Sequence, residues 1–310
     1  MSPDLLDILF KFDYFACLLI GFPLNIILIV LIIFKTPKEM KTHSQILIQN
    51  CVIDILMLTV QMFILVFYLP DTEGNTIAVF PIGILLSLMK ENFNPFISYI
   101  FTTLWKYIGL LNLHGLCLQF IYRYLILNRN MKINFRRYLF MVLVTLIVAL
   151  LYIIDEILFF MPYSKGGIKD FDNFNMTWPF IQYKMEKITL LTSLPVDIFQ
   201  ILPYLIALVC AFKMIRFVNL NSTFNGNVKK LNKLITKVML IMVVVPFINQ
   251  AGIIFILSIS KTNNNTTNMF RVLFGISFHL TPVFNPIICI LTNTPYRKAF
   301  FNSLRILHDN

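Results

Sequence analysis

The stretch Tyr14–Phe34, YFACLLIGFPLNIILIVLIIF, contains no charged side chain. About 20 mostly apolar residues span the hydrocarbon core of a bilayer as one helix. This stretch therefore predicts a membrane-spanning helix close to the amino terminus. Before it, Asp4, Asp7 and Asp13 outnumber the single cation Lys11, so the positively charged start of a cleavable signal is missing and we expect the helix to stay in the membrane.

The rest of the chain repeats this pattern. The composition is 58% hydrophobic and only 13% charged, and the mean hydropathy of +0.77 exceeds what a water-exposed surface tolerates. We therefore predict an all-α membrane protein in which residues 1–310 form a single seven-helix domain. The six further spans that meet the length criterion are Ile46–Leu69, Tyr107–Leu127, Tyr138–Phe160, Pro195–Phe217, Val238–Ile259 and Val272–Leu291. The shorter run Ile77–Met89, interrupted by Pro81 and Gly83, is expected to be a surface or re-entrant segment.

Charge predicts the orientation, because cytoplasmic loops carry an excess of lysine and arginine. Three segments between predicted spans have that excess, which places the amino terminus outside and the carboxyl terminus in the cytoplasm. The net charge of +11 is thus explained without nucleic acid. The cations are Lys35, Lys38 and Lys41; Arg123, Arg129, Lys132, Arg136 and Arg137; and Lys213, Arg216, Lys229, Lys230, Lys233 and Lys237.

Glycosylation sequons agree with this orientation at Asn175, Asn264 and Asn265, which lie in predicted outer loops. A further sequon at Asn221 is predicted to be cytoplasmic and therefore unmodified. The five cysteines all lie inside apolar runs, where a thiol packs as a small hydrophobe, and we expect no structural disulfide.

Polar side chains within the spans are candidates for function, because they are costly in hydrocarbon and usually face the bundle interior. Asn25, Asp54 and Asn285 lie at comparable depths in spans one, two and seven, so we expect them to meet. Such a cluster is interhelical hydrogen bonding alone, a site for a cation or proton, or a hinge. Pro246 and Pro286 predict kinks in spans six and seven.

A cavity at mid-depth is the second candidate site. Seven polar residues of spans three, five, six and seven are candidates to face it and bind a ligand, although a single polar group on a membrane helix more often packs against a neighbour: Asn112, His114, Gln200, Tyr204, Asn249, Gln250 and His279. The four histidines lie at different levels or in different loops, and no HExxH, CxxC, GxSxG or phosphate-binding glycine motif is present. We therefore expect no metal, no cofactor and no enzymatic activity.

Several residues resemble, in order along the chain, the marks of a seven-helix G-protein-coupled receptor. They are Asn25, the run Asn50–Asp54 (NCVID), Arg123 between two tyrosines, Pro246, and Asn285 with Pro286. The chain departs from that pattern elsewhere. Tyr122 replaces an acid, Cys289 replaces a tyrosine, Val244 replaces a tryptophan, residues 228–259 offer Arg123 no acid, and the outer cysteine pair is missing.

A closer resemblance covers most of the chain and rests on Phe34–Lys41 (FKTPKEMK), Phe80–Gly83 (FPIG), Tyr122–Tyr124 (YRY) and Pro295–Arg297 (PYR). These stretches are similar to the nematode serpentine chemoreceptors of the Str superfamily, nearest to class D or class H. The resemblance implies an odorant or pheromone receptor in the plasma membrane of a sensory cilium, with a small-molecule ligand and a heterotrimeric G protein as partners.

Under that resemblance, the conformational switch would comprise Asn25, Asp54, Arg123, Pro246, Asn285 and Pro286. The G protein would contact Arg123 and the helical face of Lys229, Lys230, Lys233 and Lys237, although these lysines are equally explained as a positive-inside signal, and Arg123 as an interfacial anchor. The alternative class is a seven-helix ligand-gated channel or transporter that uses Asp54, Asp197 and Lys106. Against it stand the lack of an inverted repeat and the outside amino terminus.

Overall fold

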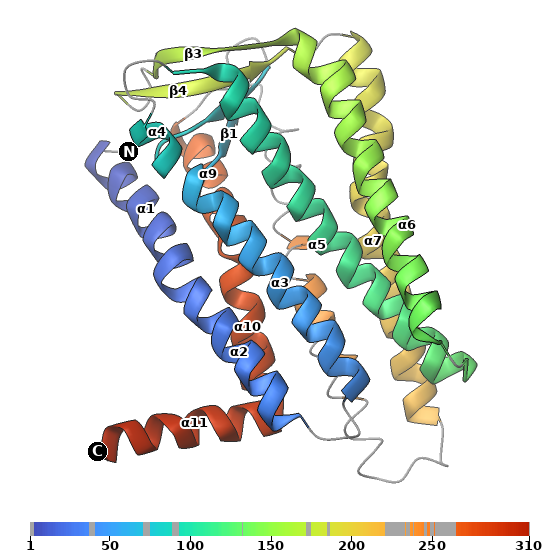
Figure 1. Cartoon of the computed structure of the whole chain (residues 1–310). Helices are drawn as coiled ribbons and strands as arrows, with labels where there is room; N and C mark the ends of the chain where they lie inside the picture. The colour runs from blue at the N-terminus through green and yellow to red at the C-terminus, as the bar shows by residue number, and fades with distance from the viewer. Residues whose placement is uncertain are drawn as a thin grey trace.

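The molecule is a bundle of long helices with a small β-sheet at one end and a transverse helix at the other (Figure 1). The amino terminus lies at the sheet end and the carboxyl terminus at the opposite end. The computed structural model describes residues 3–36, 41–70, 75–88, 93–131, 133–171, 175–184, 187–220, 233, 236–237, 239–244, 247–248, 251 and 265–309.

Long apolar helices form the walls of the bundle. Within the described residues, five are long and apolar enough to cross a membrane, and a sixth is obtained when the bent pair α9 and α10 is counted as one span. Predicted span six lies mostly outside the described residues, as do Pro246, Asn249 and Gln250. The helices are α1 (Pro3–Ala16), η1 (Cys17–Gly21) and α2 (Phe22–Lys35), which run on from one another, then α3 (Lys41–Phe63), α5 (Pro95–Arg129), α6 (Phe135–Asp155) with η3 (Glu156–Phe160), α7 (Lys187–Leu220), α9 (Asn265–His279) and α10 (Thr281–Thr292).

The first span contains one turn of π-helix, η1, which ends at Gly21, two residues before Pro23. Proline has no N–H to donate to the preceding turn, and a wider turn accommodates the unpaired carbonyl. At the level of Gly21, helices α3 and α10 both approach the first span closely. A Cβ added at Gly21 would lie 2.9 Å from Leu58 and 3.2 Å from Val283, so spans one, two and seven meet here with little space between them.

Several helices extend beyond the predicted spans, and two of the differing boundaries have a clear local cause. Helix α3 ends at Phe63 rather than Leu69, because Phe67–Pro70 pairs with Thr76–Val79 as a β-ribbon. Helix α5 begins at Pro95 rather than Tyr107, and the Asn94 side chain accepts a hydrogen bond from the Phe96 N–H at 3.0 Å. Apolarity alone misplaces both ends. At the end of α3, the apolar strand β1 looks like a continuation of the span. At the start of α5, the capped and partly polar first turn does not look like the start of a membrane helix.

A four-stranded antiparallel sheet covers one end of the bundle, and the sequence did not predict it. Its strands are β1 (Phe67–Pro70), β2 (Thr76–Val79), β3 (Ser164–Phe171) and β4 (Met176–Tyr183), in the order β1-β2-β4-β3. Because β2 pairs with β4, the segment between spans two and three is joined to that between spans four and five. The run Ile77–Met89 contributes β2 and the five-residue helix α4 (Ile84–Leu88), so it lies at this end of the bundle and does not cross it.

Aromatic side chains attach the sheet to the helices beneath it. The ring of Phe10 in α1 lies 4.6 Å from that of Phe67 in β1 and 5.6 Å from that of Trp178 in β4. Gly83, in the FPIG stretch, has a φ of +148°, and a Cβ there would lie 2.4 Å from the Phe63 carbonyl oxygen. Only glycine allows this return of the chain against the end of α3.

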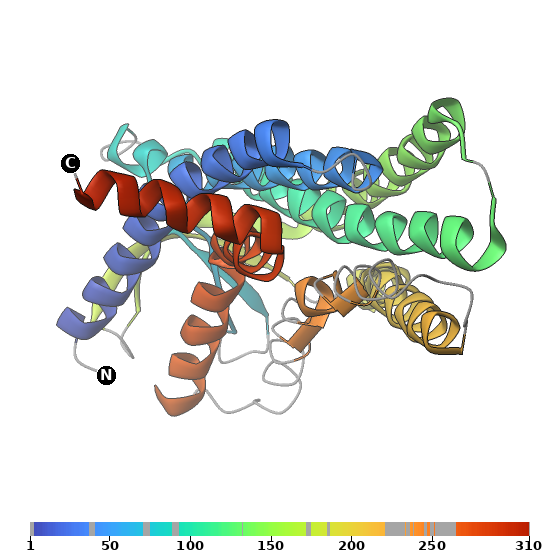
Figure 2. The same ribbon diagram turned by 90° about the horizontal axis from the view of Figure 1, so that it is seen from below.

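The opposite end is closed by α11 (Thr294–Asp309), which runs across the bundle (Figures 1 and 2). Tyr296 is fully buried, and its hydroxyl lies 2.9 Å from that of Thr36. Because Thr36 donates its own proton to the Ile32 carbonyl, Tyr296 is the donor of this pair. The FKTPKEMK and PYR stretches therefore meet, which gives two of the family-like motifs a shared structural role.

Strand β3 offers a matched test of the sheet's position. A Cβ at Gly166 would lie 2.4 Å from the Cβ of Pro95 at the start of α5, whereas one at Gly167 would lie 3.7 Å from the Phe180 ring. We expect Gly166→Ala to destabilise the protein by about 1–3 kcal/mol through overpacking, and Gly167→Ala to be nearly neutral. Thermal unfolding of the purified protein in detergent measures both, and equal melting temperatures for the two variants would contradict this contact.

Candidate functional site

A carboxylate is buried at the meeting point of three spans. Asp54 of α3 is 1% exposed. The amide of Asn285 in α10 donates to both of its carboxylate oxygens, at 3.0 and 3.1 Å, and the amide of Asn112 in α5 donates to one of them at 2.8 Å. We call Asp54, Asn112 and Asn285 the Asp54 cluster. It joins spans two, three and seven through hydrogen bonds to one buried carboxyl group.

Asn25 is predicted from the sequence to meet Asp54 and Asn285, but in the structure its amide donates to other groups. Its amide donates to the Gly21 carbonyl at 3.0 Å and to the Pro282 carbonyl at 2.9 Å. The Pro282 carbonyl lacks its usual helical donor, because that donor would be the N–H of residue 286, which is proline. Asn25 therefore compensates for Pro286, and Asn112 occupies the place expected for Asn25. Asn112, expected to bind ligand, is instead part of the Asp54 cluster.

His279 is placed at the break between α9 and α10 and does not line the cavity described below. The two helices are bent by 51°, and Pro282 near the start of α10 removes a backbone donor there. His279 is 1% exposed; its Nδ1 lies 2.7 Å from Asp13 and its Nε2 lies 2.9 Å from the Val66 carbonyl. Its own carbonyl accepts from Gln61 at 3.3 Å. His279 thus ties the break in span seven to span one and to the start of the sheet.

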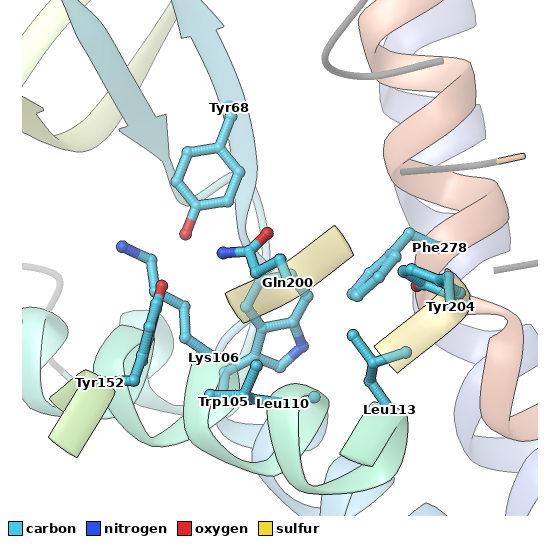
Figure 3. A pocket seen from close by; sticks show the side chains of 10 residues that line it. Tyr68, Trp105, Lys106, Leu110, Leu113, Tyr152, Gln200, Tyr204 and Phe278 are labelled. Atoms are coloured by element: carbon cyan, nitrogen blue, oxygen red, sulfur yellow. The ribbon is translucent and has the colours of Figure 1, made fainter. Parts of the chain in front are cut away.

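A cavity of about 200 Å³ lies between the sheet and the helices, on the sheet side of the Asp54 cluster. Figure 3 shows the side chains that surround it. Two of the predicted ligand-binding residues, Gln200 and Tyr204 of α7, are among them; the others were not predicted. We call this space the Trp105 cavity. Its lining consists of Tyr68, Trp105, Lys106, Gly109, Leu110, Leu113, Tyr152, Gln200, Tyr204 and Phe278.

One wall of the cavity carries a buried ion pair. The Lys106 ammonium of α5 contacts the Glu156 carboxylate of η3, and their side chains are 19% and 6% exposed. The ammonium also lies 4.7 Å from the centroid of the Tyr183 ring and 5.8 Å from that of Tyr68, distances at which a cation is attracted to an aromatic face. Opposite charges buried together compensate each other's desolvation, so the pair is neutral as a unit.

The tyrosines beside this pair are protonated at neutral pH. Burial raises the pKa of Tyr68 to about 12, against the opposing effect of the Lys106 charge, and burial raises the pKa of Tyr183 well above its usual value. The sheet therefore presents hydroxyl groups rather than phenolates to Lys106. The sequence alone predicts no function for Glu156 and a role for Lys106 only in the channel alternative. The available signal was two opposite charges near the outer ends of neighbouring spans.

Of the remaining residues predicted to bind ligand, none lines this cavity in the part of the chain that the structure describes. His114 contacts the Leu110 carbonyl at 3.0 Å and lines a separate hollow of about 330 Å³ between α5, α6 and α7. Asn249 and Gln250 lie outside the described residues. Of the three residues of the channel alternative, Asp54 and Lys106 belong to different clusters with different partners, and the side chain of Asp197 is not among those described.

Arg123 lies near the α11 end of α5 and contacts span six. Its Nη1 donates to the Met239 sulfur at 3.1 Å, which is a weak acceptor. No carboxylate forms an ion pair with Arg123 among the described residues. Of the four lysines expected beside it, Lys233 and Lys237 are exposed, and Lys229 and Lys230 lie outside the described residues. Arg123 is therefore held by a contact that breaks at little cost.

The bundle, its bent seventh span and the cavity below the sheet define a G-protein-coupled receptor fold. The crystal structure of squid rhodopsin aligns with a TM-score of 0.69 over 99% of this chain and 87% of that chain, at 13% sequence identity. At that identity the likeness concerns the fold alone. Among curated proteins, no sequence matches this chain.

The family follows from the sequence. The family model described as "Serpentine type 7TM GPCR chemoreceptor Srd" matches residues 10–302, and the chain belongs to this family. It is a multi-pass membrane protein and a chemosensory G-protein-coupled receptor, from a family of receptors rather than enzymes. The predicted fold class and the resemblance to serpentine chemoreceptors are thereby confirmed.

The Lys106–Glu156 pair makes a testable contribution to stability. We expect Glu156→Gln to destabilise the protein by about 3 kcal/mol, because it leaves the Lys106 charge buried without its partner, and we expect Lys106→Met combined with Glu156→Gln to recover most of the loss. Asp155→Asn is the control, since no cation pairs with Asp155 among the described residues. Thermal unfolding in detergent gives the comparison, and a double variant no more stable than Glu156→Gln would contradict the pairing.

Proposed function

We propose that this receptor binds a small external molecule in the Trp105 cavity and signals to a heterotrimeric G protein through Arg123. The observation that carries the proposal is that one helix, α5, supplies both places. Trp105 and Lys106 line the cavity near the sheet, and Arg123 contacts span six near the opposite end. At 1.5 Å per residue the two places are about 27 Å apart along the helix.

The cavity has the features of a small-molecule site. Its walls are mostly aromatic and apolar, with a few polar groups from Lys106, Gln200 and the tyrosines, which is the usual composition of such sites. Its volume of about 200 Å³ is below the roughly 300–1,000 Å³ of pockets for drug-sized ligands. A compact molecule, such as an odorant, fits these dimensions.

The Asp54 cluster lies between the two places. Asn112 is one helical turn from Gly109 and directly precedes Leu113, and both of these line the cavity, so a bound ligand lies next to the residue that donates to Asp54. A ligand shifts a conformational equilibrium only by its differential affinity for the two states, and a change from 1:99 to 99:1 requires about 5.5 kcal/mol. We infer that repacking around Asn112 and the bend at Leu280 relay that difference to span six.

The orientation completes the proposal. With the basic loops in the cytoplasm, the sheet faces outside and Arg123 faces the G protein together with Lys229, Lys230, Lys233 and Lys237. Asn175, at the turn between β3 and β4, is exposed and adopts a φ of +50°, so it is accessible for glycosylation; Asn264 and Asn265 are proposed as further acceptors. A receptor for external chemicals has to be exposed at the plasma membrane, and the membership of a chemoreceptor family favours the cilium of a sensory neuron as its location.

Arg123→Lys tests the coupling role. Lysine keeps the charge and the flexible stem but loses the planar five-donor group that binds carbonyls at a partner's helix end. We expect a large loss of ligand-evoked calcium or cAMP signal at equal surface expression. Arg129→Lys is the control, because Arg129 is exposed at the end of the same helix. Full signalling by Arg123→Lys would return Arg123 to the role of a membrane anchor.

A further inference from the structure

The Trp105 cavity contains a buried hydrogen-bond donor that has no partner among the described residues. Trp105 is 7% exposed, and its indole N–H, which donates and cannot accept, has no hydrogen-bond partner among the described residues. In Figure 3 the indole nitrogen lies on the side of the ring that faces Leu113 and Phe278, two other residues of the lining. A buried donor without a partner is costly, so this nitrogen is a place where a ligand gains affinity.

Lys106 adds donors to the same wall. Its ammonium has three N–H groups, and the Glu156 carboxylate accepts from it. The rings of Tyr68 and Tyr183 also attract the charge, and the Tyr68 hydroxyl can accept a hydrogen bond as well as donate one. The Tyr68 hydroxyl is directed into the space between Lys106 and Gln200 in Figure 3. Among the described lining residues, Lys106 thus has acceptors beside it, whereas the donor-only N–H of Trp105 has none, which favours a ligand that accepts.

Charge restricts the ligand further. The Lys106 ammonium is already compensated by Glu156, and both side chains are largely removed from solvent. A carboxylate ligand would place two anions beside one cation, and an amine would place a second cation beside Lys106. Either excess charge would be poorly compensated in this buried site, where unpaired charge carries a large desolvation cost. A neutral acceptor incurs neither cost.

We propose that the Trp105 cavity recognises a small neutral molecule with an apolar or aromatic body and a carbonyl-type oxygen, as in a ketone, aldehyde or ester, and that this oxygen accepts a hydrogen bond from Trp105 Nε1. Trp105 is then a specificity-determining residue. The aromatic faces of Phe278 and Tyr204 pack against the body of the ligand. The inference rests on the proposed function for the location of the ligand, but it concerns binding and does not depend on coupling to a G protein.

Binding is measured on the purified full-length receptor, without a G protein, as the ligand concentration that gives half-maximal thermal stabilisation. The probes are medium-chain and aromatic ketones and esters, with the alkane, carboxylic acid and amine of each matching carbon skeleton. We expect the ketones and esters to stabilise the wild-type receptor and the acids and amines to fail. Binding of acids or amines as tight as that of the neutral acceptors, or no binding by any ketone or ester, overturns the proposal.

The variant Trp105→Phe keeps the aromatic ring and removes the N–H. We expect it to weaken ketone binding roughly fivefold, the effect of one net hydrogen bond, and to leave alkane binding unchanged. The control is Trp178→Phe, the same change at the chain's other tryptophan, which packs in the sheet against Phe10 and Phe171. Equal ketone affinity of Trp105→Phe and wild type overturns the role of Trp105. Ketone binding without any G-protein signal in cells would refute the proposed coupling and leave this inference standing.

Discussion

The hydrocarbon core offers polar side chains no water, so a buried carboxylate must find its donors on other helices. Asp54 meets that constraint with the amides of Asn112 and Asn285, and the three contacts set the depth of spans two, three and seven relative to one another. Asn25 adds span one by donating to the carbonyl that Pro286 leaves without a helical partner. A vertical shift of any of these helices by one turn, about 5.4 Å, would break the arrangement.

Further contacts extend from the level of the Asp54 cluster towards both ends of the bundle. Towards the sheet, the bend at Leu280 brings His279 to Asp13 and Val66, and the Trp105 cavity lies between α5, α7 and β1. Towards α11, the reciprocal amide contact of Asn50 with Gln119 and the contact of Arg123 with Met239 follow along α3 and α5. The cavity and Arg123 are thus connected through one helix whose position depends on Asp54, which is a physical basis for coupling the two.

Hydrophobic length and the placement of lysine and arginine are sufficient to predict a multi-span helical receptor, because the bilayer imposes both patterns on every segment separately. The sequence does not predict the sheet because β1 and β2 have only four residues each and β2 pairs with β4 far along the chain. In addition, the apolar β1 continues the hydrophobic pattern of span two. Contacts that depend on the direction in which each helix face points are not predictable from the sequence alone. Depth relates Asp54 to Asn285, but it does not distinguish Asn25 from Asn112 as the third member of the cluster. Nor does depth pair His279 with Asp13, or Lys106 with Glu156, which lies 50 positions further along the chain.

The central claim is that Asp54 and Asn285 act as one unit, and a double-mutant cycle tests it most directly. The free energies of unfolding of wild type, Asp54→Ala, Asn285→Ala and the double variant would be measured by detergent-induced unfolding of the purified receptor. Asp54→Ala combined with Asn175→Ala, at the exposed hairpin turn, is the independent control pair. The account predicts an interaction energy of about 0.6 kcal/mol or more between Asp54 and Asn285 and additivity in the control. Additive losses for Asp54→Ala and Asn285→Ala would contradict it.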